Sequence, residues 1–184
     1  MTCLSPWADA ALAQSVAQPD TFKGDITRFH GDQNALVNAI GTIEQFSGVK
    51  VVDIRCSDAH GNPGFHAVIV RNGRIAFFHV QQASKKVIEI DASSGPVWML
   101  GWRSRADVNF AEHAPVPLAS AIRTAEQSQN GAPAMAAGIA RSASNMQSAV
   151  QAYTVLLVVD GRVTSVSVDI SSGQVISDPS ALSM

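Results

Sequence analysis

The sequence predicts an α+β protein built from two repeats, each a helix followed by a three-stranded antiparallel sheet, with the helix packed on one sheet face. Three observations lead to this prediction. Two distant parts of the chain match each other, each part contains an amphipathic helical stripe, and each contains a tight-turn dipeptide between β-branched runs. The expected boundaries are 29–97 for the first repeat, 98–115 for a connecting segment and 116–184 for the second repeat.

Two blocks of the chain recur in the same order. Residues 36–45 match 118–127, with Leu, Ala, Ile, Thr, Glu and Gln at equivalent positions. Residues 70–75 match 158–163 around a turn dipeptide that is followed by Arg. Agreement by chance in two separate blocks is improbable, so the chain is interpreted as a duplication.

The first block of each repeat is predicted to be a helix, because its apolar residues follow the i, i+3, i+4, i+7 spacing of one helical face. The two stripes are Leu36, Ala39, Ile40 and Ile43, and Leu118, Ala121, Ile122 and Ala125. Asp32 is a candidate N-cap of the first helix and Gly48 its candidate C-terminal stop. Pro117 suits the first turn of the second helix, and Gly131 is expected to end it.

The second block of each repeat is predicted to be a β-hairpin. An Asn-Gly dipeptide at 72–73 and an Asp-Gly dipeptide at 160–161 separate β-branched runs, and such dipeptides favour type I′ turns because both central residues need positive φ. A further strand is expected before each hairpin, at 51–56 and, less clearly, at 138–143. Three strands with a helix on one face are near the minimum for a stable unit.

The end of the first repeat is open to two alignments. Without a gap, residues 84–88 fall on 172–176. Alternatively, the Asp-Ala-Ser-Ser-Gly segment at 91–95 echoes 169–173, which would give the first repeat an extra strand at 87–90. The gap-free alignment is preferred.

The two-residue turn predicts the cross-strand partners of the first hairpin. These are Val70 with Ile75, Val68 with Phe77, and His66 with His79, all on one face. The opposite face is more uniformly apolar and is expected to pack on the helix; it carries Phe65, Ala67, Ile69, Ala76, Phe78 and Val80. In the second repeat, Thr154 and Ser167 stand where the first repeat has its histidines.

The face with the histidines is too apolar to be left exposed to water, so another segment or a partner is expected to pack on it. One interpretation is internal: the other repeat, or the connecting segment with Trp98 and Trp102, packs on it. The other is a surface for a protein partner, with the sheet edge available for strand addition. The candidate contact residues are then Val68, Ile75 and Phe77, with His66 and His79 at the rim.

Metal and enzyme chemistry are not favoured. His66 and His79 offer two ligands where a tetrahedral site usually needs three or four, so two hydrogen-bonded imidazoles are the preferred interpretation and a metal at this pair is the alternative. The sequence has no G-x-S-x-G, H-E-x-x-H, C-x-x-C, P-loop or dinucleotide-binding motif. We therefore expect no enzymatic activity and no cofactor.

Composition and charge exclude some classes of partner and bear on the location of the protein. The net charge is -2 and the basic residues are scattered, which argues against nucleic-acid binding. No apolar run approaches the roughly 20 residues that span a bilayer. Residues 1–28 are expected to be a tail; its Ala-x-Ala triplets at 8–10 and 11–13 indicate either the remains of an export signal or a low-complexity segment. A periplasmic or secreted location is expected.

The order of helix, strand, D/N-G-R hairpin and closing D-x-S-S-G-x-V segment resembles the PepSY domain family. The second repeat, over 118–176, is the better match, through 153–161 and 166–175. The first, over 33–88, departs at 81–85, where Asp and Gly are expected. The resemblance implies a module found mostly outside the cytoplasm, in propeptides of secreted metallopeptidases and in envelope proteins, with a proposed role in restraining peptidases and no catalytic residues.

These expectations combine into one functional hypothesis: a non-catalytic exported module that binds a protein partner, with a peptidase as the partner that the resemblance implies. The alternative is an envelope protein that binds a small molecule or metal in a cleft between the repeats. That cleft would be lined by His66, His79 and either Trp98 or Trp102.

Overall fold

The computed structural model describes residues 32–57, 63–71, 74–90, 113–140 and 152–176. Its helices are α2 (Ala35–Ser47) and α4 (Leu118–Ser128). The strands of the first half are β1 (Val51–Ser57), β2 (Gly64–Arg71), β3 (Arg74–Gln81) and β4 (Val87–Ile90). Those of the second half are β5 (Ala134–Ala140), β6 (Ala152–Val159) and β7 (Arg162–Asp169).

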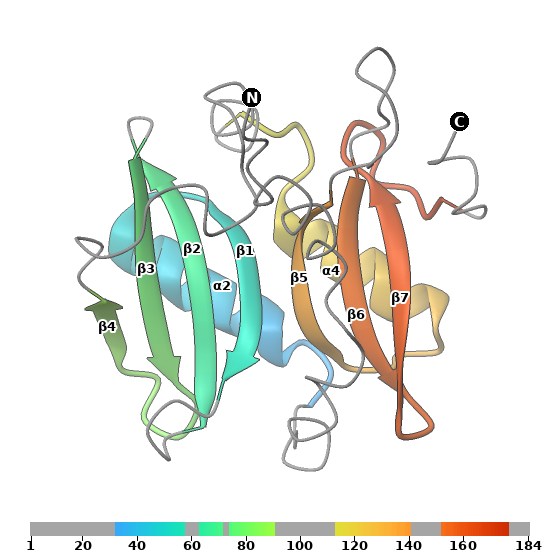
Figure 1. Cartoon of the computed structure of the whole chain (residues 1–184), viewed down its shortest axis with the longest axis horizontal. Coiled ribbons are helices and arrows are strands. Elements are labelled where there is room, and N and C mark those ends of the chain that lie inside the picture. Colours follow the sequence, from blue (N-terminus) through green and yellow to red (C-terminus); the bar gives the residue numbers. More distant parts are fainter. Residues whose placement is uncertain (1–31, 58–62, 72–73, 91–112, 141–151, 177–184) are drawn as a thin grey trace, which may run out of the picture.

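The seven strands form one antiparallel sheet in the order β4-β3-β2-β1-β5-β6-β7 (Figure 1). The prediction of two repeats with separate three-stranded sheets is therefore wrong: the described part of the chain is mostly β, with two helices and a single sheet. The reason lies in the backbone. In separate sheets β1 and β5 would each be an unpaired edge, and pairing them satisfies the hydrogen-bonding groups of both strands.

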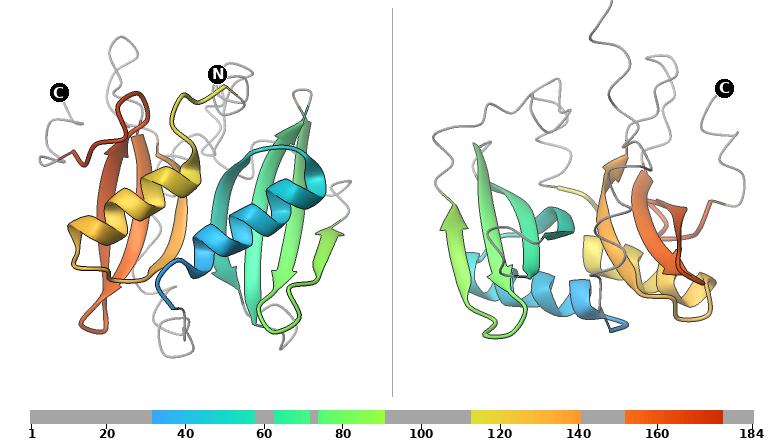
Figure 2. Two further views of the ribbon diagram at one scale, coloured as in Figure 1. Left: turned by 180° about the vertical axis from the view of Figure 1, so that it is seen from behind. Right: turned by 60° about the horizontal axis from the view of Figure 1, so that its bottom comes forward.

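The junction between the halves, where β1 pairs with β5, is close to two-fold symmetric. Each strand has a shift of register near its start, at 51–53 in β1 and at 134–136 in β5. Aligning these irregularities makes Ile54 equivalent to Ala137, and these two residues pair with each other across the junction. Both helices lie on one face of the sheet and run in opposite directions, as this symmetry requires (Figure 2).

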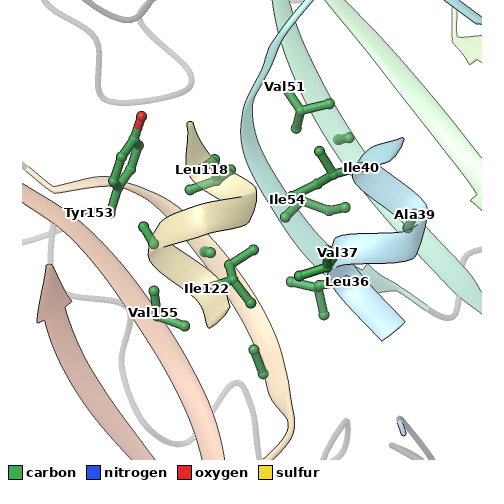
Figure 3. Close-up of a cluster of buried hydrophobic side chains, with 14 of the residues drawn as sticks. Leu36, Val37, Ala39, Ile40, Val51, Ile54, Leu118, Ile122, Tyr153 and Val155 are labelled. Carbon is green, nitrogen blue, oxygen red and sulfur yellow. The ribbon is translucent and has the colours of Figure 1, made fainter. Parts of the chain in front are cut away.

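One apolar core joins the two halves. Every residue of the two predicted helical stripes is buried in it, and so is nearly all of the predicted helix-facing side of the first hairpin, with Ala76 packed at its margin. Figure 3 shows Leu36 and Ile40 of α2 in the same cluster as Leu118 and Ile122 of α4. Sharing one core matters because modules of this size bury little apolar surface alone.

The helix ends partly follow the prediction. Asn34 rather than Asp32 is the N-cap of α2, and no side chain caps that end. Gly48 follows α2 with a φ of 68°, as a C-terminal stop requires. Pro117 directly precedes α4, whereas Gly131 lies in the turn after the helix, with a φ of 81°.

The first strand of the second half begins earlier than predicted. The prediction was 138–143, but β5 covers Ala134–Ala140, and residues 141–143 lie outside the described part of the chain. The segment is rich in alanine and carries no alternating pattern. Its extended conformation comes from pairing with β1 and β6 on its two sides, so local sequence alone could not place its ends.

Both hairpins have the predicted register. The three partner pairs expected in the first hairpin are all present, and Thr154 faces Ser167 at the equivalent place in the second. In the second turn Asp160 and Gly161 have φ values of 49° and 71°, as a type I′ turn requires. Residues 72–73 of the first turn lie outside the described residues.

The end of the first repeat keeps the gap-free alignment and also has the extra strand, whereas residues 91–95, on which the second alignment rests, lie outside the described residues. The extra strand exists as β4, paired with β3. The gap-free alignment also holds, because the pair Val80–Val87 of this ladder corresponds to an isolated bridge between Val168 and Val175 in the second half. Up to residue 176, where the described part of the second half ends, this half shows the first step of the pairing that β4 extends.

The loops before these pairs are equivalent as well. The N–H of Lys85 donates to the carbonyl of Gln81 (2.9 Å), and the N–H of Gly173 donates to that of Asp169 (2.8 Å). Lys85 has a φ of 53° where Gly173 has 72°. The first half therefore keeps the loop geometry without the Asp and Gly of the second half.

The recurring glutamate of the helical block has a structural role in both halves. The Oε1 atom of Glu44 accepts a hydrogen bond from the N–H of Val51 (3.0 Å), and that of Glu126 accepts one from the N–H of Ala134 (3.0 Å). Each glutamate thus ties its helix to the start of the following strand. Glu126 also accepts a longer bond from the N–H of Asn34 (3.4 Å), which links α4 to the start of α2.

Candidate functional site

The predicted histidine pair is present on the face of the sheet that carries no helix, called here the helix-free face. The rings of His66 on β2 and His79 on β3 meet edge to face, with centroids 4.9 Å apart and planes at 84°. His79 is buried. Gly64 leaves room for its ring, since a Cβ atom there would stand only 2.7 Å from Cε1 of His79.

The apolar residues predicted to contact a partner are mostly packed. Val68 is only 5% exposed, and it clusters with Val52 and Val70, against which Ile75 and Phe77 pack partly buried. A partner therefore has no access to Val68 and only limited access to Ile75 and Phe77. This part of the helix-free face does not offer the open surface that the binding hypothesis needs.

The alternative of a metal or ligand between the repeats finds little support in the described residues. Within them, no group of three or more His, Cys, Asp and Glu side chains is arranged to hold a metal. The histidine pair lies on β2 and β3, separated by β1 from the junction of the two halves. Trp98 and Trp102 lie outside the described part of the chain.

A half-buried carboxylate at the junction was not predicted. Asp53 lies on β1 beside Gly138 of β5, and a Cβ atom at Gly138 would overlap the carboxyl group of Asp53. Burial raises the pKa of Asp53 to about 6, although the nearby positive charge of Arg55 acts in the opposite direction. The signal available in the sequence was an Asp inside the β-branched run 51–54.

Ionisable side chains line the helix-free face next to this carboxylate. Arg55 on β1 is the cross-strand neighbour of His66, which in turn faces His79. The helix-free face thus places a carboxyl group with a raised pKa, a guanidinium group and two imidazole rings on adjacent strands.

The exposed apolar side chains lie elsewhere, around β4. Among the described residues the large hydrophobic side chains with high exposure are Phe46 (61%), Ile88 (39%) and Ile90 (38%). Phe46 projects from α2 and contacts Phe78 of β3 edge to face, with ring centroids 6.1 Å apart. The strand β4 is the last in the sheet (Figure 1). The sequence had raised strand addition at a sheet edge without identifying the edge.

The backbone of β4 presents hydrogen-bonding groups outward. A bond from the N–H of Gln81 to the carbonyl of Lys86 (3.1 Å) opens the β3–β4 ladder. In antiparallel pairing every second residue bonds to the neighbouring strand, so the even-numbered residues of β4 face β3. The N–H and C=O groups of Val87 and Glu89 therefore point to the outer edge.

The opposite edge of the sheet is less accessible. Beside β7, the N–H of Ile176 donates to the carbonyl of Ser167 (2.8 Å), and Val175 bridges to Val168. The closing segment thus occupies part of the outer backbone of β7. Of the two sheet edges in the described residues, β4 is the one with free outward groups and exposed apolar side chains.

Comparison with known proteins leaves the family open. No family model matches the chain, and no curated protein matches it. A crystal structure of a putative lipoprotein from Clostridium difficile 630 is similar at a TM-score of 0.39 and 13% sequence identity, over 79% of this chain and 92% of that chain. The PepSY resemblance stays a prediction. In the described residues, none of the helices has the length and apolar character needed to cross a membrane.

Proposed function

We propose that this protein is a non-catalytic binding module that accepts an extended segment of a protein partner at the outer edge of β4. The observation that carries the proposal is the combination at that edge of outward backbone groups, at Val87 and Glu89, with the exposed side chains Ile88 and Ile90. In strand addition the main-chain hydrogen bonds supply affinity, and alternate side chains supply specificity.

The edge is a better binding surface than the helix-free face. Val68, at the centre of the predicted patch, is buried, whereas three of the four residues of β4 are exposed. Natural proteins usually protect a free edge with charged residues, and Lys85 and Lys86 do precede β4. A strand edge that merely has to avoid aggregation would not be expected to expose two isoleucines, such as Ile88 and Ile90.

The resemblance to PepSY domains supports the choice of partner. It implies a module that acts mostly outside the cytoplasm and restrains peptidases. The partner in this proposal is therefore an exported protein, with a peptidase as the first candidate. The absence of recognisable catalytic motifs from the sequence supports a binding role.

The proposal predicts a specific effect of proline at position 89. Glu89→Pro removes an outward N–H but none of the β3–β4 hydrogen bonds, and proline is tolerated on edge strands. Peptides selected from a random library against the wild-type chain should bind Glu89→Pro at least about tenfold more weakly than wild type, because the lost hydrogen bond alone contributes about 1 kcal/mol or somewhat more. Calorimetric titration with the selected peptides measures the difference.

Glu89→Ala is the matched control, since it removes the same side chain but keeps the N–H, and the selected peptides should bind Glu89→Pro about tenfold more weakly than Glu89→Ala. Circular dichroism verifies that both variants fold. Independently of either variant, the amide protons of Val87 and Glu89 should exchange more slowly when peptide is bound to the wild type. Selected peptides that bind Glu89→Pro as tightly as Glu89→Ala, with no protection at these amides in the wild type, would refute the proposal.

A further inference from the structure

The side chains along the β4 edge alternate in a defined way. Ile88 and Ile90 face the helix-free side, because their partners on β3 are His79 and Phe77. By the same alternation Lys86, which is exposed, faces that side too. The helix-free side of the edge therefore presents a positive charge followed by two apolar positions.

The helix side of the edge has a different character. Glu89 is exposed, and its partner on β3 is Phe78. Phe78 is also the ring against which the exposed Phe46 packs. A negative charge and an exposed aromatic ring therefore lie on the same side of the edge, a combination that suits a basic side chain through ion pairing and a cation–π contact.

Resting on the proposed function, we infer that the β4 edge selects an antiparallel partner strand with the order apolar, basic, apolar, any residue, acidic. The first and third residues of the segment would lie beside Ile90 and Ile88, the second beside Glu89, and the fifth beside Lys86. Opposite charges and apolar pairs in directly opposed positions stabilise antiparallel strands, whereas like charges destabilise them.

The antiparallel orientation follows from the sheet itself. Each pair of neighbouring strands in the sheet is antiparallel. Antiparallel pairing is also slightly more stable per residue than parallel pairing. A parallel partner would need the reverse order of residue types, so orientation and sequence preference can be tested together.

Three synthetic peptides test this inference on the full chain. The matched peptide contains Val-Lys-Val-Thr-Glu, the charge-reversed peptide contains Val-Glu-Val-Thr-Lys, and the reversed-order peptide contains Glu-Thr-Val-Lys-Val. Titrations followed by the NMR shifts of the β4 amides should give an affinity for the matched peptide about five- to tenfold above that for either control. The variant Lys86→Glu should reduce the preference for the acidic fifth residue.

Each contrary result has a distinct meaning. Equal binding of all three peptides, lost in Glu89→Pro, would overturn the sequence preference while leaving strand addition intact. Tighter binding of the reversed-order peptide would overturn the antiparallel orientation. A third outcome is that neither the three peptides nor those selected from a library shift the NMR signals of the β4 amides, in wild type or in Glu89→Ala. That outcome would overturn both the inference and the proposed function.

Discussion

Replacing Glu126 with alanine is expected to lower the free energy of unfolding by about 3 to 5 kcal/mol. Glu126 is only 1% exposed, and its Oε1 atom accepts hydrogen bonds from the N–H groups of Ala134 and Asn34. The substitution leaves both donors without this acceptor and opens a cavity where α4 meets the start of α2. Urea denaturation, followed by circular dichroism, measures the change.

The first half of the chain supplies a matched control. Glu44 occupies the equivalent position and makes the equivalent bond to Val51, but it is half-buried and does not bridge the two helices. Glu44→Ala should therefore cost only about 1 kcal/mol. Glu126→Gln, which keeps one carbonyl oxygen, should retain most of the stability. Equal losses in the two alanine variants would show that the link from Glu126 to Asn34 contributes nothing.

Replacing Asp53 with asparagine is expected to increase stability at pH 7.5 by about 1 to 3 kcal/mol. The folded protein raises the pKa of Asp53 from 3.8 to about 6 because burial disfavours its charged form. At pH 7.5 the wild-type chain must hold this charge in a half-buried position. Asparagine has a similar shape, also fits over Gly138, and carries no charge.

The pH dependence of this gain has a definite sign. Below about pH 3.8 the carboxyl group is neutral in both the folded and the unfolded state, so it has no ionisation penalty. Between about 3.8 and 6 the unfolded chain releases the proton first, and the stability of the wild type falls as pH rises. Above about pH 6 both states are ionised and the penalty is constant.

Urea denaturation of wild type and Asp53→Asn at pH 4, 5, 6 and 7.5 tests this dependence. The difference in the free energy of unfolding should be near zero at pH 4 and largest at pH 7.5. Asp160→Asn, in the exposed turn between β6 and β7, should have little effect, since Asn also tolerates positive φ. A constant difference across this pH range would mean that the charge of Asp53 is not the cause.

Several features of the fold could be predicted from the sequence because they depend only on residues that are close together along the chain. Helical stripes, the strand alternation and the Asp160-Gly161 turn follow from backbone geometry that repeats every few residues. The cross-strand pairs, including His66 with His79, follow from the length of the turn. The two matching blocks are equally visible, since finding them needs only a comparison of the chain with itself.

The candidate site could be predicted only in part. The sequence placed His66 and His79 opposite each other, and the structure confirms it. It could not say whether Val68 is open to a partner, because exposure depends on what packs over a face rather than on which face a residue occupies. It also could not identify β4 as the accessible edge, since Ile88 and Ile90 have the same local pattern in a central strand as in a terminal one.

The joining of the two halves into one sheet was decided only by tertiary structure. Backbone N–H and C=O groups are the same in every residue, so no side-chain pattern marks β1 and β5 as partners. Their pairing places Asp53 over Gly138 and brings Glu126 to the start of α2. Local sequence thus predicts the helix and hairpin of each half, whereas contacts between distant segments determine which edge is closed, which charge is buried and which strand remains open.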